Sequence, residues 1–143
     1  MAAKEKGRVL IVEDDLLLSM VEERLVQKLG YCVVGKAEKG SEAVTKVAEL
    51  NPDIVIMDIS LKGEIDGIEA MQKIRENSCV PVIYLSGSAD RYHYERAKKT
   101  NFIDFLEKPI TSNQLEKPLE SALYESDSRQ KSDSENHRYN KSA

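Results

Sequence analysis

Four short apolar runs, separated by stretches with helical periodicity, constrain the fold of this chain more than any other feature. The runs span residues 9–12, 54–57, 82–85 and 105–106. Short runs that are rich in β-branched residues and bounded by turn residues are typical of buried parallel strands. Together with a fifth strand-like run, they predict strands at about residues 8–13, 31–36, 53–58, 82–86 and 102–106.

The stretches between these runs carry apolar residues at three- and four-residue spacing, which predicts amphipathic helices. Gly30 is expected to end the first helix as a C-cap glycine. A polar helix is predicted from about Ala89 to Lys99, and a last helix from about Thr111, where residues 111–114 have capping-box form. Pro118 lies within the last helix and is expected to kink or delay it. The face of the first helix toward the sheet is expected to contain Leu17, Leu18, Val21, Leu25 and Leu29.

Five strands that alternate with five helices predict right-handed crossovers and a doubly wound α/β fold with a parallel sheet. The length of 143 residues suits one domain with a buried core, and a second folded domain does not fit. We assign residues 1–7 to an N-terminal extension and residues 8–124 to the domain. From residue 125 no aliphatic side chain occurs until Ala143, so residues 125–143 are predicted to form a disordered tail. No output domain is expected in this sequence.

Composition excludes several classes of function. The formal net charge is −4, and lysines and arginines are scattered among acids, so direct binding of nucleic acid is not expected. No apolar stretch approaches the roughly 20 residues needed to span a bilayer, and residues 1–7 do not resemble a signal peptide. Cys32 and Cys79 form no metal-binding motif and are expected to stay reduced. These features favour a cytoplasmic protein without a membrane partner.

Acidic residues follow two of the predicted strands. Glu13, Asp14 and Asp15 come directly after the first strand, and Asp58 ends the third. Parallel sheets place their sites at the carboxyl ends of the strands, so these groups are expected to gather at one rim. Mg²⁺ prefers oxygen ligands and would relieve the repulsion between clustered carboxylates. The alternative is that these acids only cap the helix that follows the first strand. We favour this interpretation for Asp15 but not for Glu13 and Asp14.

Two further strand ends carry groups that suit phosphate chemistry. Ser86 follows the fourth strand and Lys108 the fifth, where Pro109 favours an extended backbone. A carboxylate such as Asp58 can attack phosphorus and form an aspartyl-phosphate, and a lysine offers a compact positive charge to phosphate. In isolation, a loop serine and a solvated lysine are the commoner interpretations. The combination at successive strand ends predicts a metal-assisted phosphoryl site.

These residues make the chain resemble the receiver domain of two-component response regulators. The resemblance covers about residues 7–124 and is carried by the segments LIVEDD, DIVIMDISLKGEIDGIEA, VIYLSG and RAKKTNFIDFLEKP. It implies a flavodoxin-like (βα)5 fold with strand order 2-1-3-4-5. It also implies that the chain is a signalling phosphoacceptor and not an enzyme that acts on other substrates. The implied phosphoryl donor is a sensor histidine kinase or a phosphotransfer protein.

The resemblance assigns a role to each matching residue. It implies that Asp58 is the phosphoacceptor, Ser86 the switch hydroxyl, Lys108 the phosphate-binding lysine and Phe105 the aromatic switch residue. A bound Mg²⁺ would take Asp14, Asp58 and the backbone carbonyl of Ser60 directly and Glu13 through water. Phosphorylation would then bias strands four and five and the fourth and fifth helices toward a partner-binding form.

The sequence departs from the usual pattern of the receiver family at two points, and two alternative functions remain open. The loop at residues 60–67 is longer than the family's usual proline-containing loop, and Pro118 lies in a helix that often forms the receiver dimer face. A receiver fold that acts by docking without phosphorylation is the first alternative. A phosphohydrolase of the haloacid-dehalogenase type is the second, although its nucleophile comes early in the chain and has a second aspartate two residues later, where Ser60 stands here.

Overall fold

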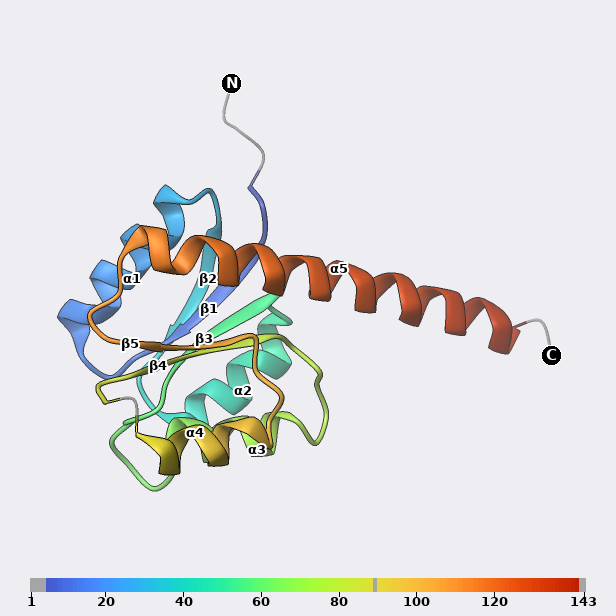
Figure 1. The fold of residues 1–143 in the computed structure, drawn as a ribbon. Helices are drawn as coiled ribbons and strands as arrows, with labels where there is room; N and C mark the ends of the chain where they lie inside the picture. The colour runs from blue at the N-terminus through green and yellow to red at the C-terminus, as the bar shows by residue number, and fades with distance from the viewer. Residues whose placement is uncertain (1–4, 89, 142–143) are drawn as a thin grey trace.

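A computed structural model describes residues 5–88 and 90–141, which form a parallel sheet with helices on both of its faces (Figure 1). The strand order is β2-β1-β3-β4-β5, so the predicted fold class and topology are confirmed. The predicted strand positions agree with the structure to within two residues. The strands are β1 (Arg8–Val12), β2 (Cys32–Ala37), β3 (Ile54–Asp58), β4 (Val82–Ser86) and β5 (Asp104–Glu107).

Two apolar cores lie on opposite faces of the sheet. Helices α1 and α5 cover one face, and α2, α3 and α4 cover the other (Figure 1). Gly30, with a φ of 97°, ends α1 as predicted, and Thr111 forms the predicted reciprocal bonds with Gln114 ahead of α5. The helices are α1 (Leu16–Lys28), α2 (Gly40–Leu50), α3 (Gly67–Ile74), α4 (Arg91–Lys98) and α5 (Ser112–Lys141).

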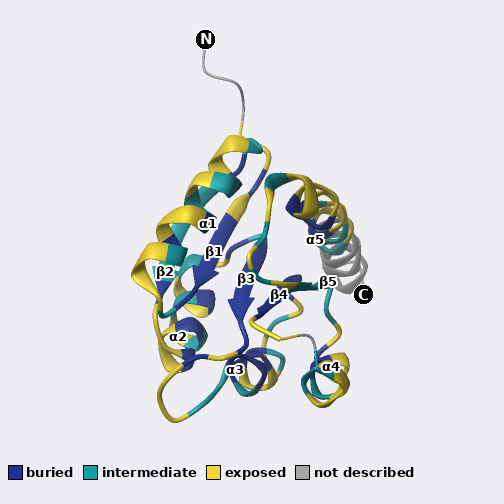
Figure 2. Cartoon of the chain, turned by 60° about the vertical axis from the view of Figure 1, so that its left-hand side comes forward, coloured by how far each residue is buried: buried dark blue, intermediate teal, exposed yellow. Residues whose placement is uncertain are grey.

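The register of the strands brings their carboxyl ends to one rim. Every residue of β3 and β4 is buried, as expected for strands that are covered on both faces (Figure 2). Val12 pairs with Met57, Asp58 with Leu85, and Ser86 with Glu107. The residues that end or follow these strands therefore emerge side by side.

Helix α1 presents a different face to the sheet from the one predicted. Leu17 is 70% exposed and Val21 is 45% exposed, whereas Ser19, Glu22 and Val26 are buried. Leu18, Leu25 and Leu29 are half-buried, in agreement with the prediction. The run of three leucines at residues 16–18 fits more than one apolar stripe, so periodicity alone does not define the rotation of this helix.

Helix α5 continues through the segment that was predicted to be disordered. The helix runs to Lys141, so the predicted boundary at residue 124 falls inside it, and residues 142–143 lie outside the described residues. Beyond that boundary Ser126 is buried, and Arg129 donates to the backbone carbonyl of Cys79 and pairs with Glu125 at 2.7 Å. These contacts extend the helix past the last apolar residues of its buried face. Pro118 is buried within α5, and the helix continues through it.

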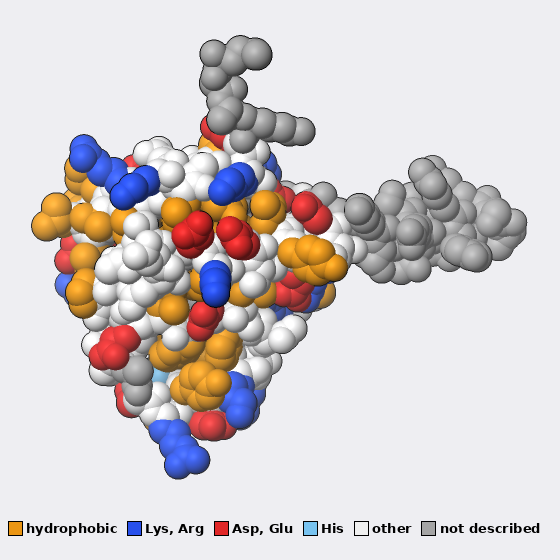
Figure 3. Space-filling model, turned by 45° about the horizontal axis from the view of Figure 1, so that its top comes forward, with side chains coloured by type: hydrophobic (Ala, Val, Ile, Leu, Met, Phe, Trp, Pro, Cys, Tyr) orange, Lys and Arg blue, Asp and Glu red, His pale blue; other side chains and the backbone are white. Residues whose placement is uncertain are grey.

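Other predictions are tested only in part. Helix α4 begins at Arg91 with Asp90 as its N-cap, and Ala89, the predicted start, lies outside the described residues, as do residues 1–4 of the predicted extension. Cys32 and Cys79 are free thiols. Within the described residues, no helix has the length and apolarity that crossing a membrane requires. On the face that Figure 3 draws, lysine and arginine side chains lie among acidic ones and form no continuous basic patch.

Truncating buried Leu119 of α5 should destabilise the fold far more than truncating Leu17 of α1. Leu119 is fully buried, so Leu119→Ala should lower the free energy of unfolding by about 3 kcal/mol through lost burial and a residual cavity. Leu17→Ala removes the same atoms from an exposed position and should change it by less than about 0.5 kcal/mol. Urea unfolding followed by circular dichroism measures both. A loss at Leu17 comparable to that at Leu119 would contradict the observed rotation of α1.

Candidate functional site

Four strand ends bring the predicted site residues to one rim of the sheet. Glu13 follows β1, Asp58 ends β3, Ser86 ends β4 and Lys108 follows β5. The backbone N–H of Lys108 donates to the carbonyl of Ser86 at 2.8 Å, which keeps the end of β5 beside the end of β4. The polar groups thus converge because the strands that carry them are neighbours in the sheet.

Lys108 lies between two buried carboxylates. Its Nζ is 2.7 Å from Glu13 Oε1 and 3.1 Å from Asp58 Oδ1. Glu13 is 1% exposed and Asp58 is 2% exposed, so both carboxylates lack full solvation by water. Removing a carboxylate from water is costly unless a countercharge or hydrogen bonds replace the solvent, and Lys108 supplies the countercharge here.

The pKa values of the three groups reflect this arrangement. Burial and the neighbouring Glu13 raise the pKa of Asp58 to about 6, although Lys108 acts in the opposite direction. Burial alone would raise the pKa of Glu13, but hydrogen bonds with Glu22, Lys108 and Asp58 hold it below its usual value. Burial acts to lower the pKa of Lys108, but the interactions with Glu13 and Asp58 outweigh it and raise this pKa above its usual value. The two carboxylates thus favour the charged form of Lys108, and Lys108 favours the ionised form of both carboxylates.

The acidic residues also form a set of oxygen ligands. One carboxylate oxygen from each of Glu13, Asp14 and Asp58 lies within 4.8 Å of the other two. Clustered carboxylate oxygens are the ligands that Mg²⁺ prefers, so these residues fit a divalent cation. Asp14 Oδ2 also accepts from the backbone N–H of Lys62 at 3.0 Å, and Asp58 Oδ1 from that of Ser60 at 3.1 Å.

A shallow hollow of about 290 Å³ joins the acidic set to the predicted phosphate-binding groups. Asp15 also borders it, but its Oδ1 accepts from the N–H of Leu18 at 3.0 Å and caps α1, which agrees with the interpretation of this residue as a cap. Most predicted site residues therefore share one surface. The residues that line the hollow are Glu13, Asp14, Asp15, Leu18, Asp58, Ser60, Lys62, Gly87 and Lys108.

Ser86 and Phe105 do not line this hollow. Ser86 is buried, and its hydroxyl donates to the backbone carbonyl of Ser88 and accepts from the N–H of Ser88 at 3.2 Å. Phe105 is half-buried, with its ring centroid 6.3 Å from that of Tyr84 and 5.6 Å from that of Tyr94. The hydroxyl is thus directed toward the loop that precedes α4, and the aromatic ring packs against α4 itself.

Glu22 is a buried carboxyl group behind Glu13 that the sequence interpretation missed. It lies on the buried face of α1, is 3% exposed, and its Oε1 has no hydrogen-bond partner among the described residues. Burial, followed by the effect of Glu13, raises the pKa of Glu22 to about 9, so the group is neutral at pH 7. The apolar spacing from which the sheet-facing side of this helix was predicted does not include Glu22, so the sequence gave no signal of this contact.

Gly67 allows the backbone after Asp58 to close on itself. A Cβ atom at this position would lie 2.1 Å from the backbone oxygen of Asp58, so only glycine fits without a backbone shift. The N–H of Gly67 donates to the carbonyl of Ile59 at 2.9 Å. This approach brings the start of α3 directly beneath the end of β3.

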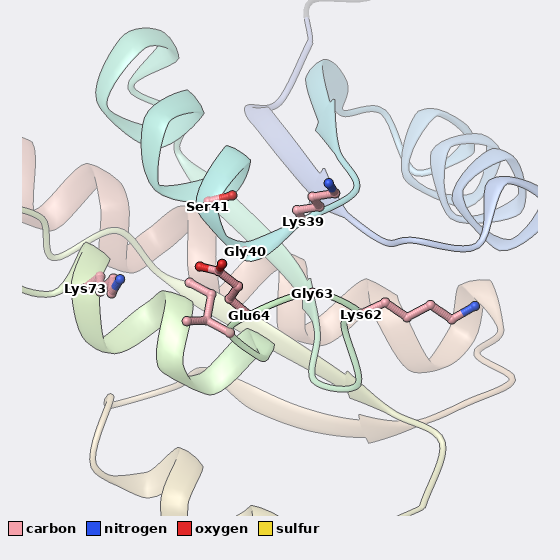
Figure 4. A pocket seen from close by; sticks show the side chains of 8 residues that line it. Lys39, Gly40, Ser41, Lys62, Gly63, Glu64 and Lys73 are labelled. Atoms are coloured by element: carbon pink, nitrogen blue, oxygen red, sulfur yellow. The ribbon is translucent and has the colours of Figure 1, made fainter.

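The longer loop at residues 60–67 also borders a second hollow, of about 360 Å³, at the start of α2. Three lysines line it, but Figure 4 shows Lys62 and Lys73 on opposite sides of the hollow. The positive groups do not converge on one point. The candidate site is therefore the acidic rim and not this hollow.

Comparisons with known proteins agree on one family. The family model of the response regulator receiver domain matches residues 9–120. Over 117 residues the chain is 37% identical to the transcriptional regulatory protein PdtaR of Mycobacterium tuberculosis, which covers 81% of this chain and 56% of that protein. It is 36% identical over 113 residues to the chemotaxis protein CheY of Thermotoga maritima, covering 78% of this chain and 93% of CheY.

A solved structure gives the same result. The signal receiver domain of a modulated diguanylate cyclase from Desulfovibrio desulfuricans superposes with a TM-score of 0.79 at 33% sequence identity, covering 86% of this chain and 98% of that one. The acidic rim of a doubly wound parallel sheet thus occurs here in a known class of signalling domain. This chain belongs to the response regulator receiver family of two-component systems. The match spans 56% of the length of PdtaR.

Replacing Glu22 with glutamine should flatten the pH dependence of stability. The pKa of Glu22 is about 9 in the folded protein against 4.5 for an ordinary glutamate, so between these values the folded state holds a proton that the unfolded state lacks. Stability therefore falls as the pH rises through this range. Between pH 5.5 and 8.5, without metal, Glu22→Gln should lose less of its free energy of unfolding than the wild type.

Urea unfolding at several pH values measures this difference, with Glu23→Gln on the same helix as the matched control. Asp58 contributes in the same direction in all three proteins, so the comparison isolates position 22. An equal fall in the wild type and Glu22→Gln would show that this carboxyl is not buried as the structure has it.

Proposed function

We propose that this chain accepts a phosphoryl group on Asp58 from a sensor histidine kinase or a phosphotransfer protein, with Mg²⁺ bound at the acidic rim. The observation that carries the proposal is the convergence of Asp58, two further carboxylates and Lys108 at the ends of neighbouring strands. Family membership supports it, because the matched residues 9–120 include all of these groups. Cytoplasmic location stays a prediction from the sequence.

The reaction is an in-line transfer to a carboxylate oxygen. An oxygen of Asp58 forms the new O–P bond while the N–P bond of the donor phosphohistidine breaks, and the imidazole leaves with the electron pair and takes up a proton. Asp58 is suited to this role because Lys108, 3.1 Å from its Oδ1, favours the ionised carboxylate. Positioning and electrostatic stabilisation supply most of the catalysis in phosphoryl transfer.

The groups around Asp58 hold the phosphoryl charge. Lys108, already 3.1 Å from Asp58 Oδ1, would move its contact to a phosphoryl oxygen. Gly87 borders the same hollow, and we assign its amide to the phosphoryl group as well. We assign the metal to Asp14, Asp58 and the carbonyl of Ser60, with Glu13 acting through water. The cation supplies charge neutralisation at the acidic rim when it is bound.

The response to phosphorylation is assigned to Ser86 and Phe105. The hydroxyl of Ser86 would exchange its bond with Ser88 for one with the phosphoryl group, and Phe105 would change its packing between Tyr84 and Tyr94. This biases β4, β5, α4 and α5 toward a form that binds the downstream protein. Ser60 and Ser88 flank the approach of a hydrolytic water and tune the lifetime of the phosphorylated state.

An apolar surface lies beside the acidic rim. Leu16 is 68% exposed, and Leu17 and Met20 on the same helix are also exposed. Leu18, on the next position of α1, borders the hollow that contains Asp58. Contiguous exposed apolar side chains are typical of protein-interaction surfaces, so we assign this part of α1 to the docking of the phosphoryl donor.

Incubation with acetyl phosphate and Mg²⁺ tests the proposal. Intact-mass measurement should show the addition of one phosphoryl group to the wild type and none to Asp58→Asn, because the amide is a poor nucleophile. Chelation of Mg²⁺ should abolish the addition. Asp15→Asn is the matched control, since this nearby acid caps α1, and it should be phosphorylated like the wild type.

Two results would contradict the proposal. Addition to Asp58→Asn would place the acceptor elsewhere. Absence of addition to the wild type, both from acetyl phosphate and from a phosphorylated histidine kinase, would favour a module that docks without phosphorylation.

A further inference from the structure

Helix α4 is held to the rest of the domain by few interactions. Of its eight residues, Arg91–Lys98, only Ala97 is buried. Tyr94 packs edge-on against Phe102 and Phe105, and Tyr92 is 68% exposed. In Figure 2 the helix lies at the edge of the molecule, beneath β5 and beside α3. Elements with few buried contacts lie at the low-stability end of a structure, so individual contacts of α4 carry unusual weight.

One ion pair ties α4 to the start of α3. Arg96 Nη1 lies 2.9 Å from Asp66 Oδ2, and both side chains are about three-quarters buried, with exposures of 24% and 25%. Water therefore screens this pair less than the exposed pair between Lys98 and Glu95, whose atoms are 3.8 Å apart. The Arg96 guanidinium also lies over the ring of Tyr92, with 5.6 Å between its Cζ and the ring centroid.

The carboxylate of Asp66 is oriented before it meets Arg96. Its Oδ1 accepts from the N–H of Glu69 at 2.8 Å, and Glu69 in return accepts from the N–H of Asp66, which forms a capping box at the start of α3. One carboxylate oxygen thus caps α3 while the other binds α4. Because the cap already restricts the Asp66 side chain, little further conformational freedom is lost when the ion pair forms.

Asp66 also lies on the backbone segment that leaves the acceptor. Ser60 donates to the Asp58 carboxylate at one end of this segment, and Gly67 donates to the carbonyl of Ile59 at the other. A change at the Asp58 carboxylate therefore bears on the segment that carries Asp66. This route to α4 does not pass through Ser86 or Phe105.

We propose that Asp66 and Arg96 are positioning residues that latch α4 in its unphosphorylated arrangement. This inference rests on the proposed function, because the latch opposes the phosphorylated arrangement, which exists only if Asp58 is phosphorylated. Phosphorylation of Asp58 shifts α4 at the expense of the Asp66–Arg96 contact, so the ion pair raises the free energy of the phosphorylated arrangement relative to the resting one. Loss of the pair removes this difference and so favours the phosphorylated arrangement by the free energy that the pair contributes to the resting one.

Hydrogen exchange in the unphosphorylated protein tests the latch without any phosphoryl chemistry. Arg96→Gln and Asp66→Asn should each raise the exchange rates of the α4 amides by a factor on the order of three, which is the scale of one partly buried ion pair. Asparagine is a good N-cap, so Asp66→Asn should leave the α3 amides unchanged. The double variant should exchange no faster than Arg96→Gln, because both substitutions remove the same ion pair and only Arg96→Gln also removes the contact with Tyr92.

Phosphorylation by acetyl phosphate supplies the second measurement. Arg96→Gln and Asp66→Asn should be phosphorylated about threefold faster than the wild type, and Arg96→Lys, which keeps the charge, should stay close to the wild-type rate. Lys98→Gln is the matched control on the same helix, since its contacts, the exposed pair with Glu95 and a position over the ring of Tyr94, both stay within α4. It should change neither measurement.

Each outcome has one meaning. Unchanged α4 exchange in the single variants, or additive changes in the double variant, would overturn the latch. Faster exchange with a wild-type phosphorylation rate would reduce the pair to a structural contact and also overturn it. If the wild type itself gains no phosphoryl group, the proposed function fails, and the mass spectrum of that protein identifies this case separately from the exchange data.

Discussion

The charge of Lys108 between the carboxylates of Glu13 and Asp58 is the constraint on which the rest of the site depends. Two carboxylates that are almost fully buried repel one another and lack solvation, and a lysine at 2.7 and 3.1 Å compensates for both effects. This compensation requires β1, β3 and β5 to end at the same level. The strand register therefore determines the electrostatics, and the buried apolar strands maintain the register.

A second consequence of this packing lies in α1. The helix turns Glu22 toward Glu13 and leaves leucines on its outer surface, contrary to a simple apolar periodicity. The buried carboxyl avoids a further negative charge near Glu13 by remaining neutral, with a pKa of about 9. The same rotation places apolar side chains beside the acidic rim, where a partner can reach them. Burial of a polar group and exposure of apolar ones are thus two results of one helix orientation.

The chain downstream of Asp58, the proposed acceptor, joins this residue to the side of the domain that carries α3 and α4. Gly67 permits a close approach to the Asp58 backbone, and the adjacent Asp66 caps α3 and binds Arg96 of α4. Phe105 and Tyr94 form a separate, apolar contact between β5 and α4. Two different kinds of interaction therefore hold α4: an ion pair to the segment that follows Asp58, and an aromatic contact to β5.

The sequence by itself determined the five strands, their order once the family resemblance was recognised, and the gathering of Glu13, Asp14, Asp58 and Lys108 at one rim. These features follow from local apolar runs and from the rule that parallel strands end together. Only the tertiary structure decided the rotation of α1, the helical backbone beyond residue 124, the burial of Glu22 and the pairing of Asp66 with Arg96. These depend on contacts between residues far apart in the chain, which local periodicity does not encode.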